Sequence, residues 1–158
     1  MKRLVTLSML LLVFACNQPG SNESSPKDSV TVISNDTIPE IRTSVKSTPA
    51  AEYSEPIKDE LNKWKFAVEL YETNRTFHFT MRIQAKEARV TDSVNIPNFG
   101  IWPKVEIRKD KEPLTCVVGF LNKKNEFMPY RQVSFQNDRL RIKSLATYSV
   151  GVYKTKTQ

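Results

Sequence analysis

Two neighbouring stretches, residues 63–70 and 77–86, alternate between large apolar and mostly polar positions. The apolar positions are Trp64, Phe66, Val68 and Leu70 in the first stretch, and Phe77, Phe79, Met81, Ile83 and Ala85 in the second. A period of two is typical of a strand with one buried face. Because the turn-like residues 72–75 separate them, the two stretches predict an antiparallel hairpin.

Six further stretches have the features of short strands. They are residues 90–96, 101–108, 114–121, 127–135, 140–142 and 148–152. The third of these, LTCVVGFL, is apolar on both faces and should be the most buried strand. Pro129 suits an edge strand or a bulge. The pattern predicts an all-β fold, an antiparallel β-sandwich of seven or eight strands of immunoglobulin-like or transthyretin-like type, with a small β-barrel as the second choice.

The first sixteen residues have a different pattern. Lys2 and Arg3 precede an apolar run over residues 4–14, which ends at Ala15 and Cys16. The run is about half as long as the ~20 residues that a membrane-spanning helix needs. A charged start, a short apolar run and a small residue before the cleavage point predict a signal peptide over residues 1–15.

The end of this segment resembles the lipobox of bacterial lipoproteins. Val13 and the small Ala15 stand before Cys16, as in that family. The resemblance implies that Cys16 is acylated and becomes the new N-terminus, so that the protein is held on a membrane by lipid. By the sorting rule of the family, Asn17 favours the outer membrane, where the domain would face the periplasm or the cell surface.

Residues 16–57 are rich in Ser, Thr and Pro and have no sustained apolar period. Such a composition cannot bury enough apolar surface to form a core, so we expect a disordered tether. Near its end, Ser54, Glu55 and Pro56 predict a short helical turn. The sandwich domain is expected over residues 58–158.

The composition excludes several kinds of chemistry. The 158 residues include one His, two Cys and four scattered Gly, which rules out multi-histidine or multi-cysteine metal sites and glycine-rich phosphate loops. His78 is expected to face outward from a strand, and Cys116 to be a buried apolar residue without a disulfide partner. Asp110 and Glu112 are interpreted as solvated surface charges. We therefore expect no catalytic residues, no metal and no cofactor.

The net charge of +7 is unevenly distributed. Residues 58–158 contain nineteen basic and eleven acidic residues, a net charge of +8. A basic domain can bind nucleic acid, but an exported protein meets other anions, and aromatic stacking motifs are missing. We therefore expect an envelope protein as partner, or an anionic surface such as lipopolysaccharide, and no nucleic acid.

Trp102, Lys104 and Arg108 are the candidate partner-binding residues. If the residues at 101, 105 and 107 face the core, these three lie on the opposite face, and an exposed Trp beside basic residues is a frequent recognition anchor. Alternatively, Trp102 packs beneath a loop or against the second sheet. We favour the packed position, because Pro103 can bulge the strand and reverse the alternation.

These features predict a non-enzymatic, membrane-anchored envelope lipoprotein that acts as a binding or assembly module. In general plan it resembles the outer-membrane accessory lipoproteins of type VI secretion systems, which implies a role as an accessory subunit of a secretion or transport complex. The alternative is a small-ligand carrier or a hydrolase inhibitor of the cell envelope.

Overall fold

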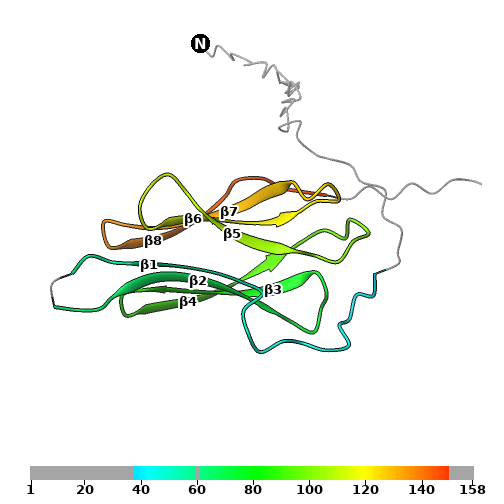
Figure 1. Cartoon of the computed structure of the whole chain (residues 1–158), viewed down its shortest axis with the longest axis horizontal. Helices are drawn as coiled ribbons and strands as arrows, with labels where there is room; N and C mark the ends of the chain where they lie inside the picture. Colours follow the sequence, from blue (N-terminus) through cyan, green and yellow to red (C-terminus); the bar gives the residue numbers. More distant parts are fainter. Residues whose placement is uncertain (1–37, 60, 150–158) are drawn as a thin grey trace, which may run out of the picture.

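A computed structural model describes residues 38–59 and 61–149 as eight β-strands in two antiparallel sheets (Figure 1). The first sheet contains β1 (Ala51–Pro56), β2 (Lys65–Glu72), β3 (His78–Ala85) and β4 (Ala88–Asn95). The second contains β5 (Val105–Lys109), β6 (Thr115–Leu121), β7 (Phe127–Gln136) and β8 (Arg139–Ser144). Cys16 and the signal segment lie outside the described residues.

The predicted β-sandwich is confirmed, and the sheets do not close into a barrel. Each sheet is a meander in which strands that follow one another in the chain are neighbours, in the orders β1-β2-β3-β4 and β5-β6-β7-β8. This order differs from the immunoglobulin plan, in which the chain passes between the sheets several times. Here the chain crosses once, between β4 and β5. Every pairing between two of these eight strands is therefore a pairing of consecutive strands in the chain.

The hairpin predicted from the alternation between residues 64 and 86 is confirmed as β2 and β3. Val68 pairs with Ile83, and Leu70 with Met81, so the apolar positions of both strands point to the same face. All four of these side chains are buried. A shift of the register by one residue would turn these side chains into water. The cost of exposing them therefore fixes the pairing of the two strands.

The core fills the space between the sheets. Its largest side chains are Phe66, Phe79 and Phe120, each at most 2% exposed. Burial of one such side chain contributes about 1.5–3 kcal/mol to folding. Phe120 also stacks on Phe99 with 5.5 Å between ring centroids, which extends the core to the loop before β5.

The prediction of a helical turn at residues 54–56 was wrong, because these residues belong to β1. The sheet thus begins at Ala51, before the expected domain boundary at residue 58. Tyr53 pairs with Val68 and packs edge-on against Phe66, with 6.2 Å between ring centroids. This one aromatic side chain is enough to pack β1 on the core, because β1 is an edge strand and its other face is in water. Pro56 ends the strand, where the missing N–H does no harm.

The residues before β1 are also fastened to the sandwich. Ile41 forms a β-bridge with Arg75, and the Thr76 hydroxyl donates a hydrogen bond to the Pro39 carbonyl at 2.5 Å. Arg42 pairs with Glu72 at the end of β2. The tether predicted over residues 16–57 therefore does not extend through these residues as free chain.

Two strand boundaries also differ from the predictions. The strand expected from residue 101 begins at Val105, because residues 96–104 form a loop that turns over the end of the sandwich. Tyr148, placed in a last strand, instead follows β8 as irregular chain, and its ring packs on Phe120 at 5.2 Å. Val150 and Val152 lie outside the described residues. Within the described ranges there is no helix long and apolar enough to cross a membrane.

Candidate functional site

The outer face of the second sheet carries the candidate site, which we call the polar face. Val133 and Phe135 of β7 point into the core, so the alternate residues Gln132, Ser134 and Gln136 point outward. The strand register builds rows across this face. One row is Arg108, Val117, Gln132 and Lys143, and the next contains Thr115, Ser134 and Arg141.

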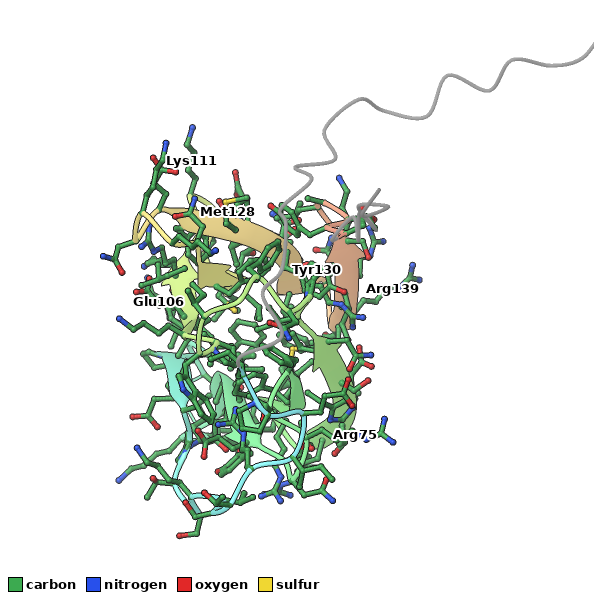
Figure 2. All side chains as sticks on the ribbon, turned by 90° about the vertical axis from the view of Figure 1, so that its right-hand side faces the viewer. Arg75, Glu106, Lys111, Met128, Tyr130 and Arg139 are labelled. Carbon is green, nitrogen blue, oxygen red and sulfur yellow. The ribbon has the colours of Figure 1, made fainter. Side chains whose placement is uncertain are left out.

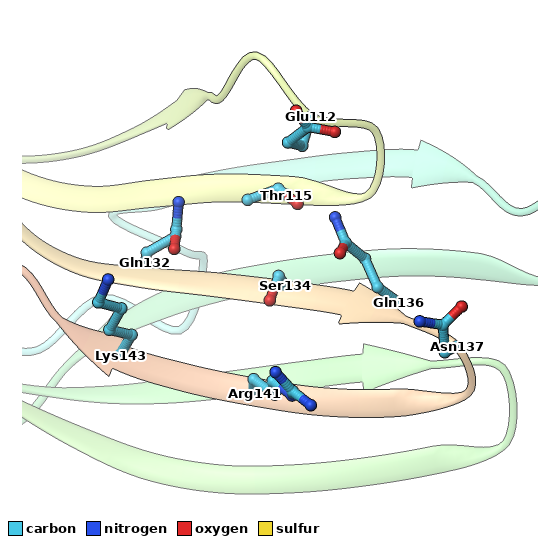
Figure 3. Close-up of a pocket in the computed structure, with 8 residues that line it drawn as sticks. All are labelled: Glu112, Thr115, Gln132, Ser134, Gln136, Asn137, Arg141 and Lys143. Atoms are coloured by element: carbon cyan, nitrogen blue, oxygen red, sulfur yellow. The ribbon is translucent and has the colours of Figure 1, made fainter.

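A cavity of about 310 Å³ lies on the polar face (Figure 3). Its lining consists of polar side chains from β6, β7, β8 and the turns beside them: Glu112, Thr115, Gln132, Ser134, Gln136, Asn137, Arg141 and Lys143. Figure 3 shows the amide side chains of β7 between strand β6 and the two cations of β8. The site thus offers hydroxyl, amide and cationic groups to one ligand.

The two cations of the cavity are uncompensated. Among the described residues, neither Arg141 nor Lys143 forms an ion pair, and Arg139 continues the same basic row on β8. Glu112 is the one carboxylate in the lining and lies at the opposite rim. The positive side of the cavity is therefore able to receive an anion without first breaking a salt bridge.

On the other side of the cavity, the polar groups are held in place. Gln132 Nε2 donates a hydrogen bond to Asp110 Oδ2 at 2.6 Å. This bond, followed by one from the Lys111 N–H, lowers the pKa of the Asp110 carboxyl. The Thr115 hydroxyl is 2% exposed and donates to the Pro113 carbonyl. These contacts fix the floor and one wall before any ligand arrives.

The structure separates the residues predicted to bind a partner. Arg108 lies on the polar face, where its guanidinium stacks 4.1 Å from the ring centroid of Phe127 and pairs with Glu106 at 2.7 Å. Lys104 precedes β5 and is exposed. Trp102 lies in the loop at the end of the sandwich and is 50% exposed, so it is not the packed residue that we favoured. It lies before the regular strand, where the alternation does not hold.

The residues considered for catalysis lie apart. His78 begins β3 on the outer face of the first sheet, with Nδ1 3.3 Å from the Thr73 hydroxyl. Cys116 is fully buried in β6 of the second sheet, and burial raises the pKa of its thiol to about 12. A thiol with this pKa is not a nucleophile near neutral pH. No group of three or more His, Cys, Asp or Glu side chains in the described ranges is arranged to hold a metal ion.

Sequence reasoning missed the basic row of β8. The signal was present in the segment RLRIKS, in which Arg139, Arg141 and Lys143 alternate with Leu140 and Ile142. The sequence alone did not show which residues of the neighbouring strand lie beside these cations. The register with β7 brings Arg141 beside Ser134 and Lys143 beside Gln132, which turns a charged edge into one side of a cavity.

Comparison with known proteins gives no relative: no family model, no curated protein and no solved structure matches the chain.

Proposed function

We propose that this protein is a non-enzymatic binding module of the bacterial cell envelope, held on the outer membrane by lipid on Cys16. It binds an acidic partner protein through the polar face, as an accessory subunit of an envelope assembly such as a secretion or transport complex. The observation that carries the proposal is the cavity in which Arg141 and Lys143 have no acidic partner among the described residues.

The chemistry of the cavity favours an acidic partner. Uncompensated cations attract anionic surfaces and speed their association. The hydroxyl and amide groups beside these cations can fix the orientation of a bound carboxylate. Arg108 at the opposite side of the sheet is neutralised by Glu106, so the attraction is concentrated along β8.

The positions of the reactive side chains support a binding role over catalysis. His78 and Cys116 lie in different sheets, one on an outer face and one in the core. Neither reaches the cavity lining. Nucleophilic catalysis requires a nucleophile and a base within hydrogen-bonding distance, and this pair does not meet that requirement.

The test has two parts. Acyl labelling of the intact protein and of Cys16→Ser checks the anchor, and we expect only the former to be labelled. Crosslinking in native membranes, followed by mass spectrometry, identifies the partner. The double variant Arg141→Gln, Lys143→Gln should weaken its capture about tenfold at low salt, and high salt should reduce capture of the unmodified protein.

A matched control removes the same charge from the other sheet. Lys65 and Arg89 are exposed on β2 and β4 and form no ion pair within the part that the structure describes. The variant Lys65→Gln, Arg89→Gln should capture the partner normally. Equal loss in both double variants would show a general charge effect. Recovery of a co-purifying small molecule with no protein partner would instead favour a carrier.

A further inference from the structure

Five segments meet at one end of the sandwich, which we call the tether end. The register places the start of β1, β3, β5 and β7 at the same end as the finish of β2, β4, β6 and β8. The loops there are residues 38–50, 73–77, 96–104, 122–126 and 145–149. Figure 2 looks onto this end, and Figure 1 shows it from the side. The described chain begins at this end, with residue 38.

Exposed apolar side chains are concentrated at the tether end. Seven large apolar residues in the described ranges are exposed, and four of them lie in these loops. They are Ile41, Val45, Trp102 and Leu145, with 69%, 47%, 50% and 41% of their surface exposed. They come from three loops, so they form scattered apolar projections and not one groove.

A cavity of about 350 Å³ adds apolar surface to the same end. Phe99, Phe120 and Met128 supply its apolar walls, and the turn between β6 and β7 supplies Lys123 and Lys124 at its mouth. Figure 2 shows Met128 at the top of this end and Arg75 at the bottom, so that the end extends over both sheets.

The charged groups around these side chains are mainly positive. Lys46, Arg75, Lys104, Lys123 and Lys124 lie in the loops and form no ion pair among the described residues. Arg42 is neutralised by Glu72, which leaves Glu40 and Glu126 as the carboxylates of this end. The opposite end differs, because Lys86 there pairs with Asp138, and Asp59, Glu87 and Glu112 balance its other lysines.

The loops are held in defined positions. Asn122 Oδ1 accepts hydrogen bonds from the N–H groups of Lys124 and Glu126, which fixes the turn that carries both lysines. Asn98 Oδ1 accepts from the Gly100 N–H in the loop of Trp102. These bonds therefore fix the local conformation of the two loops that carry Trp102 and the two lysines.

From this arrangement we infer that the tether end is a membrane-binding surface that contacts anionic phospholipid headgroups. Trp and aliphatic side chains partition into the interfacial region of a bilayer, while lysines extend toward its phosphates. Scattered apolar projections suit a fluid lipid surface better than a protein, which would need a matching surface of its own. The inference rests on the proposed membrane location, which keeps this end near lipid at high effective concentration. In this position, the polar face stands upright on the membrane.

The experiment uses the chain from residue 17 to residue 158, which contains every described residue and lacks both the apolar leader and Cys16. Its sedimentation with vesicles of phosphatidylethanolamine and phosphatidylglycerol is compared with vesicles of phosphatidylcholine alone. We expect binding to the anionic vesicles only. Lys123→Gln, Lys124→Gln should weaken this binding about thirtyfold, because each basic residue near an anionic surface strengthens binding about fivefold.

The control variant Lys63→Gln, Lys111→Gln removes two exposed charges from the opposite end and should bind normally. In a Trp64→Phe background, the fluorescence of Trp102 should shift to shorter wavelength on binding. No binding to anionic vesicles, an equal loss in both double variants, or an unshifted Trp102 spectrum would overturn the inference. Acyl labelling of Cys16 in the intact protein is independent of these results, so failure of the lipid anchor is distinguished from failure of this surface.

Discussion

Arg42 and Glu72 form an ion pair that joins the segment before β1 to the end of β2. The Arg42 Nη1 to Glu72 Oε1 distance is 3.0 Å, and the two side chains are only 8% and 16% exposed. Arg42 also donates to the Thr76 carbonyl at 2.8 Å and lies 5.2 Å from the Phe79 ring centroid. A shielded pair of this kind is worth far more than a pair on the surface when one partner is removed.

Arg42→Ala should therefore lower the free energy of unfolding by about 3 kcal/mol, because it leaves the Glu72 carboxylate poorly solvated and without its partner. Urea denaturation measures this change. Lys46→Ala is the matched control: its side chain is exposed, and its contact with Glu72 is made by the backbone N–H. The control should change the free energy by less than about 0.5 kcal/mol. If Arg42→Ala changed the free energy of unfolding as little as Lys46→Ala does, residues 38–50 would not form part of the cooperative unit.

Gly119 has no room for a side chain. A Cβ at this position would lie 2.4 Å from the Met128 carbonyl oxygen and 2.6 Å from the Phe127 ring. The register of β6 and β7 shifts at this point. Gly119→Ala should lower the free energy of unfolding by about 2 kcal/mol, because the backbone of β7 must move to admit the methyl group.

Ser54→Ala, at an exposed position of β1, is the control for this substitution. Both variants can be compared by thermal unfolding, and only Gly119→Ala should show a clearly lower midpoint. A neutral result at Gly119 would mean that the backbone of β7 at the register shift moves without loss of packing.

Local pattern predicted the sandwich because most of its strands carry their own signal. Val68 and Ile83 stand in runs whose alternation identifies both strands and the hairpin between them. β1 escaped prediction because a half-buried edge strand needs few apolar residues, and Tyr53 alone does not make a period. The burial of Arg42 depends on Glu72, thirty residues away, and no local pattern reports such a partner.

The candidate site was less predictable for the same reason. Trp102 was identified by residue type, but its exposure depends on where β5 begins. The cavity combines Arg141 of β8 with Thr115 of β6, two positions that become neighbours only through the register of β7 between them. Which residues of three adjacent strands become neighbours is determined by the folded sheet and not by any local sequence pattern.

Cys116 should be unreactive in the folded protein. It is fully buried, and its thiol pKa of about 12 leaves almost no thiolate near neutral pH. Alkylation by iodoacetamide, followed by mass spectrometry, should be slow in buffer and fast in denaturant. Reaction of Cys116 at similar rates in both conditions would show that the core around β6 opens readily.

Acid should weaken the side of the sandwich where β1 and β5 meet. Glu55 Oε2 accepts hydrogen bonds from the Tyr53 hydroxyl at 2.6 Å and from the Leu114 N–H at 3.1 Å. Led by the bond from Tyr53, these contacts lower the pKa of Glu55 below its ordinary value of 4.5. The stability that the carboxylate contributes is present above that value and is lost as the pH falls through the lower, folded-state pKa.

Glu55→Gln should therefore be less stable than the unmodified protein at neutral pH, and the two should converge in acid, because protonation removes the charge that the substitution removes permanently. Urea denaturation across this pH range measures the difference. Glu52→Gln serves as control, since Glu52 is exposed on the same strand and has no side-chain hydrogen bond in the described region. A difference between Glu55→Gln and the unmodified protein that stays constant with pH would show that the shape of the side chain matters and its charge does not.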